Sequence, residues 1–151
     1  MQDLNNQKTN TKSGRHKQRT NAMKIIYQLI FNDDFEEVVP IYFEENEIDR
    51  LSATYLNEIL DIFKQNKSEV DDILENSLHE NWNIKRLSKI DLAILRVAII
   101  EMQFLKAPYK VVINEAVELA KEYSDEESYG FVNGVLKTYL QKYQGEQSDE
   151  A

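Results

Sequence analysis

The chain has 151 residues, of which 42% are hydrophobic, and its formal net charge at pH 7 is −9. This length fits one domain with a core of its own, and four glycines with two prolines argue against a loop-rich β protein. Because the chain contains no cysteine, the sequence excludes a disulfide framework, a thiolate zinc site and a cysteine nucleophile.

The charge is distributed unevenly along the chain. Residues 1–24 contain six Lys or Arg and one acidic residue, a net charge of +5, whereas the remainder contains 12 Lys or Arg and 26 acidic residues, a net charge of −14. A basic end on an acidic body is typical of an interaction tail, although a disordered, solubilising N-terminus would have the same composition. The first residues, MQDLNNQK, lack the apolar stretch of a signal peptide, so we expect a cytoplasmic location.

The polar residues 1–14 predict a disordered basic arm, and the apolar stripe after them predicts a first helix over 15–31. This stripe consists of Ala22, Met23, Ile26, Leu29 and Ile30. Acidic residues and Pro40 follow, and they predict a loop of about a dozen residues with a solvated surface.

Two further helices are predicted over 47–64 and 68–80. The first has an apolar face at three- and four-residue spacing, made by Ile48, Leu51, Tyr55, Ile59 and Phe63. The second begins with a capping box of Ser68 and Asp71, and its inward side chains are Val70, Ile73, Leu74 and Leu78. Trp82 lies in the connection to the next helix, where we expect it to pack between the two halves of the domain.

The next helix, from about residue 89 to 105, is the most apolar segment of the chain. Ser88 is its predicted N-cap, and the carboxylate of Asp91 can reach back to complete a capping box. A helix that is apolar on nearly every side is buried in a core or in a membrane, and the charges in this one make it a poor membrane span. We expect Arg96 and Glu101, which interrupt it, to be ion-paired or hydrogen-bonded inside the core.

Pro108 ends this helix, and two more helices are predicted, one over 110–123 and one after an acidic turn at 124–127. Gly130 and Gly134 lie in the last helix. Because glycine costs helix stability, the pair predicts the close approach of a neighbouring helix.

These elements predict an all-α fold, a compact bundle of six to seven helices in two packed groups that occupies residues 15–143. The residues from 144 to 151 are polar and predict a disordered tail.

Candidate catalytic and metal sites find little support. His16 and His79 stand alone, without the spacing of metal ligands, and neither an H-E-x-x-H nor a Walker sequence is present. Ser77 and Glu80 lie close to His79 in the sequence, but such neighbours on a helix do not face one another. We therefore expect a protein that is not an enzyme, with no catalytic residue, no metal and no cofactor.

The sequence resembles one known family, the NusB transcription antitermination factors. Its segments IDLAILRVAIIEM, KVVINEAVELAKEY and SYGFVNGVL, with a proline turn after the first, are similar to the C-terminal half of that family. The segment RHKQRTNAMKIIYQL is similar to the family's basic first helix. The resemblance extends over residues 15 to 140, and INEAVELAK followed by FVNGVL is its most specific part.

The resemblance implies a non-enzymatic, RNA-binding protein of the NusB fold that acts in transcription antitermination, including ribosomal RNA transcription. It further implies two partners, single-stranded boxA-type RNA and the small-subunit ribosomal protein NusE, which together join the transcription elongation complex. The acidic body of the chain suits a basic ribosomal protein.

The candidate RNA-binding residues are cations, which bind phosphates, and aromatic side chains, on which unpaired bases stack. They are Arg15, His16, Lys17, Arg19, Lys24, Tyr27, Tyr129 and Phe131. The resemblance carries over to Arg15, Lys17, Arg19, Tyr27 and Phe131, whereas His16 and Lys24 stand where the family usually has Arg and Gln. An aromatic residue at helical spacing more often belongs to the core, so exposure decides whether each ring can meet RNA.

Two alternatives stay open at this stage. The same helical fold occurs as the N-terminal domain of some RNA cytosine methyltransferases, so the chain could be an accessory module, although its 151 residues contain no catalytic α/β region. It could also be a helical protein-interaction module whose basic end is incidental. The sequence does not decide between a monomer and a homodimer, and it predicts no membrane association.

Overall fold

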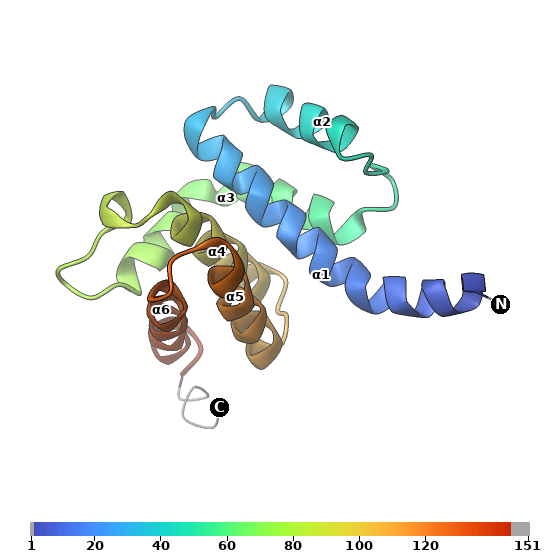
Figure 1. Ribbon diagram of the computed structural model, residues 1–151. Coiled ribbons are helices and arrows are strands. Elements are labelled where there is room, and N and C mark those ends of the chain that lie inside the picture. Colours follow the sequence, from blue (N-terminus) through green and yellow to red (C-terminus); the bar gives the residue numbers. More distant parts are fainter. Residues whose placement is uncertain (1, 146–151) are drawn as a thin grey trace. The chain divides into compact units, whose positions relative to one another are not determined.

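The structure, a computed structural model, describes residues 2–145, with side chains from Gly14 onward. As the sequence predicts, the regular elements of this range are all helical (Figure 1). They are α1 Gln2–Phe31, α2 Phe35–Glu45, α3 Thr54–Asn76, the 3₁₀ turn η1 Ile84–Arg86, α4 Lys89–Ile99, the π-helix η2 Ile100–Phe104, α5 Tyr109–Tyr123 and α6 Ser128–Tyr143. The chain divides into two compact units, Met1–Asp61 and Ile62–Ala151.

Helix α1 begins at Gln2 rather than near residue 15, so it runs through the stretch for which we expected a disordered arm. Extending a formed helix by one residue avoids the unfavourable nucleation step, and this stretch contains no proline to stop it. The polar composition that predicted disorder is therefore compatible with a continued helix.

The predicted loop after α1 is wrong, because residues Phe35–Glu45 form helix α2. The side chain of Asp34 caps this helix by accepting a hydrogen bond from the backbone N–H of Glu37 at 3.3 Å. Pro40 lies inside the helix, where its missing N–H removes the bond to one carbonyl. Burial of four apolar side chains outweighs that loss: Val38, Val39, Tyr42 and Phe43.

Helix α3 starts at Thr54, later than predicted, and consists of two helical parts joined across a kink, which correspond to the two helices expected over 47–64 and 68–80, although it ends at Asn76. It kinks at Asn66, whose φ of −128° and ψ of 25° are not helical. Leu51 therefore precedes the helix and is 90% exposed instead of lying on its apolar face. Ser68 lies within the helix, so it is not the N-cap that the sequence predicted.

The start of α3 is capped by a side chain from α1. The Oε1 of Gln18 accepts a hydrogen bond from the backbone N–H of Leu56 at 3.0 Å, close to the helix N-terminus. Ala53, which precedes the helix, has no side-chain acceptor of its own, so Gln18 satisfies a donor that would otherwise need water. Helix α2 also contacts α1, because the Tyr42 hydroxyl donates a hydrogen bond to Asn21 Oδ1 at 2.7 Å.

In the second unit, α4 is the buried central helix that the sequence predicts. Ser88 is its N-cap and accepts from the backbone N–H of Asp91 at 3.1 Å. The Asp91 carboxylate does not complete the predicted capping box; it accepts a hydrogen bond from the Ser124 hydroxyl at 2.8 Å. Helix α4 packs against α5 and α6, and α5 and α6 pack against each other.

The predicted α-helix does not continue to residue 105, because Ile100–Phe104 is a π-helix. In this segment Gln103 Oε1 accepts from the hydroxyl of Tyr139 at 2.6 Å. Burial raises the pKa of Tyr139 to about 12, so its hydroxyl keeps its proton and can also accept from Gln144 Nε2 at 2.8 Å. Gln144 is thus hydrogen-bonded rather than frayed, and residues 146–151 of the predicted tail lie outside the described residues.

Gly130 and Gly134 do not serve the predicted close approach of a helix. A Cβ added at either position would meet no atom within 4 Å, and both glycines are exposed on α6. The expectation was wrong because a glycine pair does not by itself show on which side of the helix its neighbours pack.

Arg96 is held by a two-point ion pair, which confirms the predicted structural role. Its Nε lies 2.9 Å from Asp71 Oδ1, and its second terminal nitrogen lies 2.9 Å from Asp71 Oδ2. Arg96 is only 5% exposed, and its guanidinium lies 5.4 Å from the centre of the Phe63 ring. The pair joins α3 to α4 in a place where an unpaired cation would be costly.

Replacing Asp71 with Asn should therefore destabilise the protein by about 2–3 kcal/mol, less than a fully buried pair because the Asp71 side chain is 23% exposed. The measurement is urea unfolding followed by circular dichroism. Asp72→Asn is the matched control, since Asp72 is the exposed neighbour and should change stability by no more than about 0.5 kcal/mol. Equal effects of the two substitutions would contradict the structural role of the ion pair.

Candidate nucleic-acid interface

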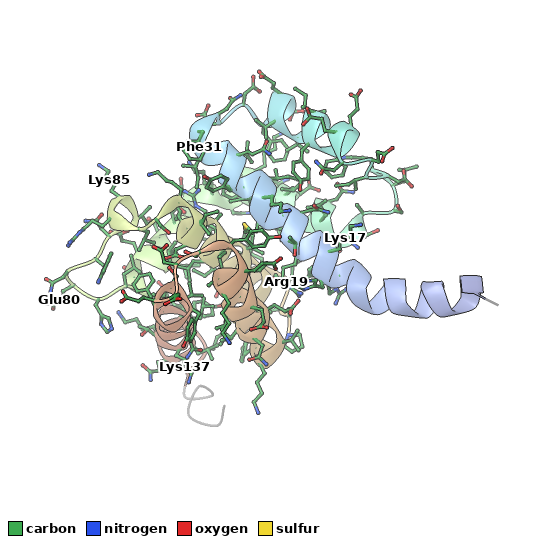
Figure 2. All side chains as sticks on the ribbon, in the orientation of Figure 1. Lys17, Arg19, Phe31, Glu80, Lys85 and Lys137 are labelled. Carbon is green, nitrogen blue, oxygen red and sulfur yellow. The ribbon has the colours of Figure 1, made fainter. Side chains whose placement is uncertain are left out.

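Helix α1 places the predicted cations in two different environments. Arg15, His16 and Lys17 are exposed, whereas Arg19 is only 3% exposed. Figure 2 labels Lys17 and Arg19 on this helix. Arg19 belongs to the apolar stripe, since it precedes Ala22 by three residues, and this spacing was the sequence signal for its burial.

Tyr55 of α3 holds two of these arginines. The guanidinium carbon of Arg15 lies 4.2 Å from the centre of the Tyr55 ring, and that of Arg19 lies 5.9 Å away. A cation over an aromatic face is stabilised by the quadrupole of the ring. Arg15 is therefore an exposed cation with a restricted orientation, whereas Arg19 is a structural residue of the first unit.

The remaining candidates of α1 are only partly accessible. Lys24 and Tyr27 are half-buried, and the Tyr27 ring meets the Phe31 ring edge to face at 5.1 Å. Arg15, His16 and Lys17 are consequently the more accessible part of the predicted basic surface.

The two candidates of α6 lie near its N-terminus and have different neighbours. Tyr129 is 44% exposed, and Lys121 Nζ of α5 lies 5.0 Å from the centre of its ring. Phe131 is half-buried, and its ring lies 5.2 Å from that of Trp82. Residues two apart on a helix do not share a face, so these two rings serve separate surfaces.

Phe131 lines a shallow pocket of about 370 Å³ in the second unit. The other residues of this pocket are Trp82, Arg86, Leu87, Ser88, Asp91, Asp125, Glu127 and Ser128. The Phe131 and Trp82 rings are tilted by 49°, and the Arg86 guanidinium lies 5.2 Å from the Trp82 ring centre while donating to the Asn81 carbonyl. We call this site the Trp82–Phe131 pocket.

The structure places Trp82 in the wall of this pocket within the second unit, and its packing between the two halves of the domain stays a prediction. Trp82 is 40% exposed and contributes its ring to the pocket wall. Sequence analysis also missed Arg86 and Asp91 as pocket residues. The sequence gives only a weak signal for these two residues, because a residue beside a helix N-terminus more often serves as a cap than as part of a binding site.

Two residues of the pocket, Asp91 and Ser128, belong to one hydrogen-bonded network. The Ser124 hydroxyl lies 2.8 Å from Asp91 Oδ1 and 2.8 Å from the hydroxyl of Ser128. This network fixes the Asp91 carboxylate, which is only 6% exposed. The pocket thus offers two aromatic rings and one cation, with oxygen acceptors beside them. Such a set can stack a planar ring and accept hydrogen bonds from its amino groups.

The described part of the chain contains no group of three or more His, Asp or Glu side chains arranged to hold a metal ion. Within the same range, no helix combines the length and the hydropathy needed to cross a bilayer.

Comparison with known proteins decides the family. A family model described as the NusB family matches residues 16–141. The chain belongs to the NusB family. This confirms the resemblance drawn from the sequence and agrees with the expectation of a protein that is not an enzyme.

Individual members support this assignment over nearly their whole length. The chain is 40% identical over 126 residues to the transcription antitermination protein NusB of Clostridium novyi, a match that covers 81% of this chain and 94% of the relative. A solved structure of NusB from T. maritima is 31% identical, covers 91% of this chain and 97% of its own, and has a TM-score of 0.78. A crystal structure of the antitermination factors NusB and NusE in complex with dsRNA contains a chain that is 29% identical to this one. The match covers 85% of this chain and 97% of that chain, with a TM-score of 0.77.

The burial of Arg19 leads to a stability prediction. Arg19→Ala should destabilise this NusB-family protein by about 1–2 kcal/mol, because it removes both the contact with Tyr55 and buried packing of the aliphatic stem. Lys17→Ala, on the exposed side of the same helix, should stay within about 0.5 kcal/mol of wild type. Urea unfolding distinguishes the two, and a larger effect of Lys17→Ala would contradict the assignment of Arg19 to the interior.

Proposed function

We propose that this NusB-family protein is an RNA-binding antitermination factor that binds single-stranded boxA-type RNA together with NusE and joins the transcription elongation complex. The observation that carries the RNA part of this proposal is the Trp82–Phe131 pocket. It combines exposed aromatic surface with a cation and with hydrogen-bond acceptors.

A single strand fits this pocket better than a duplex does. Bases inside a duplex are stacked on one another, so their faces cannot meet an aromatic side chain, whereas an unpaired base can turn out and stack. Asp91, Asp125 and Glu127 repel phosphate, and this favours the insertion of a base over the backbone. Their carboxylates can accept hydrogen bonds from the amino groups of adenine, cytosine or guanine.

The exposed cations of α1 supply the phosphate contacts in this proposal. Arg15 is already oriented by Tyr55, so its binding to a phosphate costs less conformational entropy than that of a freely moving arginine. Lys17 is exposed on the same helix. Because two cations neutralise few phosphates, we expect a modest affinity for RNA alone.

NusE would raise that affinity through a second RNA-binding surface. A structurally similar NusB has been crystallised with NusE and RNA, and the net charge of −14 after residue 24 suits a basic ribosomal protein. Coupling between two ligands is typically about 1–3 kcal/mol, so NusE should strengthen RNA binding by roughly 5- to 150-fold.

A protein-interaction module without RNA specificity is the second candidate. The three carboxylates around the Trp82–Phe131 pocket favour it, since an acidic rim also suits a basic peptide. The two candidates differ in their dependence on RNA sequence and on salt, because phosphate contacts release counterions.

The test is fluorescence anisotropy of a labelled boxA-type single strand, with a scrambled strand and a duplex as comparisons, at two salt concentrations and with or without NusE. Phe131→Ala should weaken boxA binding by about 1–3 kcal/mol through lost stacking. Arg15→Ala combined with Lys17→Ala should reduce the salt slope by about 1.4, the value for two lost contacts to a single strand. Lys137→Ala is the control, because Lys137 is an exposed lysine of α6 outside the pocket.

Wild-type protein should prefer the boxA strand, and NusE should strengthen this preference. Equal binding of the boxA and scrambled strands, or no effect of Phe131→Ala, would contradict the proposed recognition of unpaired bases. No RNA binding with or without NusE would favour the protein-interaction module.

A further inference from the structure

A second exposed surface lies in the first unit, between the C-terminal end of α1 and helix α2. Phe31 is 64% exposed and Ile41 is 48% exposed, which is unusual for large apolar side chains so close together. With Val38 they line a shallow pocket of about 340 Å³, which is completed by Gln28, Asn32 and Glu37. None of the predicted RNA-binding residues lines this pocket, which we call the α1–α2 groove.

The apolar part of the groove is held in place by the surrounding structure. The Phe31 ring meets Tyr27 at 5.1 Å with an angle of 70° between the ring planes. Val38 is 7% exposed and joins the groove to the packed interior. Asn32 Nδ2 donates to Glu37 Oε1 at 3.4 Å across the rim. A groove with ordered walls needs little rearrangement on binding, so less of the binding free energy is lost.

The segment that contains α2 carries charge of a single sign. The sequence from Asn32 to Asp49 contains eight acidic residues and no Lys, Arg or His. Glu37 precedes Ile41 by one helical turn and Glu45 follows it by one turn, so exposed carboxylates flank the apolar side chain along α2.

The ends of helices α1 and α2 do not offset this negative charge. Helix α1 has no basic residue in its last turn, so its C-terminal carbonyls add negative potential beside Phe31. The positive end of α2 is offset by its Asp34 cap and by Glu36 and Glu37 in its first turn. The groove therefore combines exposed apolar surface with a negative surround.

We propose that the α1–α2 groove docks a basic segment of a partner protein. The segment would insert an aliphatic or aromatic side chain between Phe31 and Ile41 and would place Lys or Arg side chains beside Glu37 and Glu45. The negative surround disfavours RNA and anionic lipid, and the groove, unlike the Trp82–Phe131 pocket, is lined by no cation that could contact a phosphate. No residue that lines the groove is a proposed RNA contact, and the inference does not depend on those contacts.

The test uses two labelled peptides that differ only in their apolar side chains. One carries lysines and leucines on opposite faces of a helix, and the other has serine in place of each leucine. Wild-type protein should bind the leucine peptide about tenfold or more tightly than the serine peptide, because only leucine can fill the groove.

The double variant Phe31→Ser with Ile41→Ser should lose this preference. Leu51→Ser is the matched control, because Leu51 is a 90% exposed apolar residue of the same unit outside the groove. Since all three side chains are exposed, the variants should fold, and far-UV circular dichroism checks this. Glu37→Gln with Glu45→Gln should weaken binding and reduce its dependence on salt.

Several results would overturn the proposal. One is equal peptide binding by the Phe31/Ile41 variant and the Leu51 variant. Another is a wild-type dimer in sedimentation velocity that the groove substitutions dissociate, which would make a second copy of the chain the occupant. A selective loss of boxA RNA binding in the groove variants would assign the groove to RNA instead. Because peptide and RNA are titrated separately, absence of RNA binding by wild type contradicts the proposed function and leaves the peptide result intact.

Discussion

The enclosure of helix α4 is the constraint on which the second unit depends. Every residue from 91 to 102 is buried, so this segment needs neighbours on all of its sides. Helices α5 and α6 supply two of these contacts. The same enclosure imposes a condition on the polar residues of the segment, because a buried charge without a partner costs several kcal/mol. Arg96 has Asp71 as its ion-pair partner, and Asp91 accepts a hydrogen bond from the Ser124 hydroxyl.

The hydrogen bonds of the buried Asp91 also connect the core to the candidate RNA site. Ser124 follows α5 and Ser128 begins α6, so the network that satisfies Asp91 fixes the turn between the two helices. Phe131 stands one turn further along α6 and thereby takes a defined place opposite Trp82. The pocket is therefore positioned by the core, although its own rings are partly exposed.

Sequence reasoning succeeded where one signal determined the structure and failed where two signals competed. Ser88 and Pro108 bound the central helical segment as predicted, because a capping serine and a proline act locally. Pro40 misled the prediction of α2, since burial of four apolar side chains outweighed one missing hydrogen bond. The exposure of Leu51 and the burial of Arg19 depend on where α3 begins and on which face of α1 it covers, and these are properties of the tertiary structure.

The candidate site could be predicted only in part, because residue types are visible in the sequence whereas tertiary packing is not. Phe131 was predicted as an RNA contact through the family resemblance; it is half-buried and lines the candidate pocket, and its contact with RNA stays a prediction. Trp82 and Arg86 were not identified, because their proximity to Phe131 arises only when η1 and α6 are folded together. In the basic helix, residue type predicted four RNA-binding side chains between residues 15 and 19, and the three-residue spacing of Arg19 from Ala22 was the sequence signal that one of them is buried.

The π-helix at Ile100–Phe104 has a consequence for how this core tolerates changes in length. In an α-helix, deleting one residue rotates everything beyond it by about 100° and turns the buried face outward. A π turn already accommodates an additional residue, so loss of one residue there can convert it to an α turn and leave the flanking faces aligned. The most enclosed helical segment of the protein therefore contains a site where the chain can shorten over evolution without reversing the inside and outside of the helices around it.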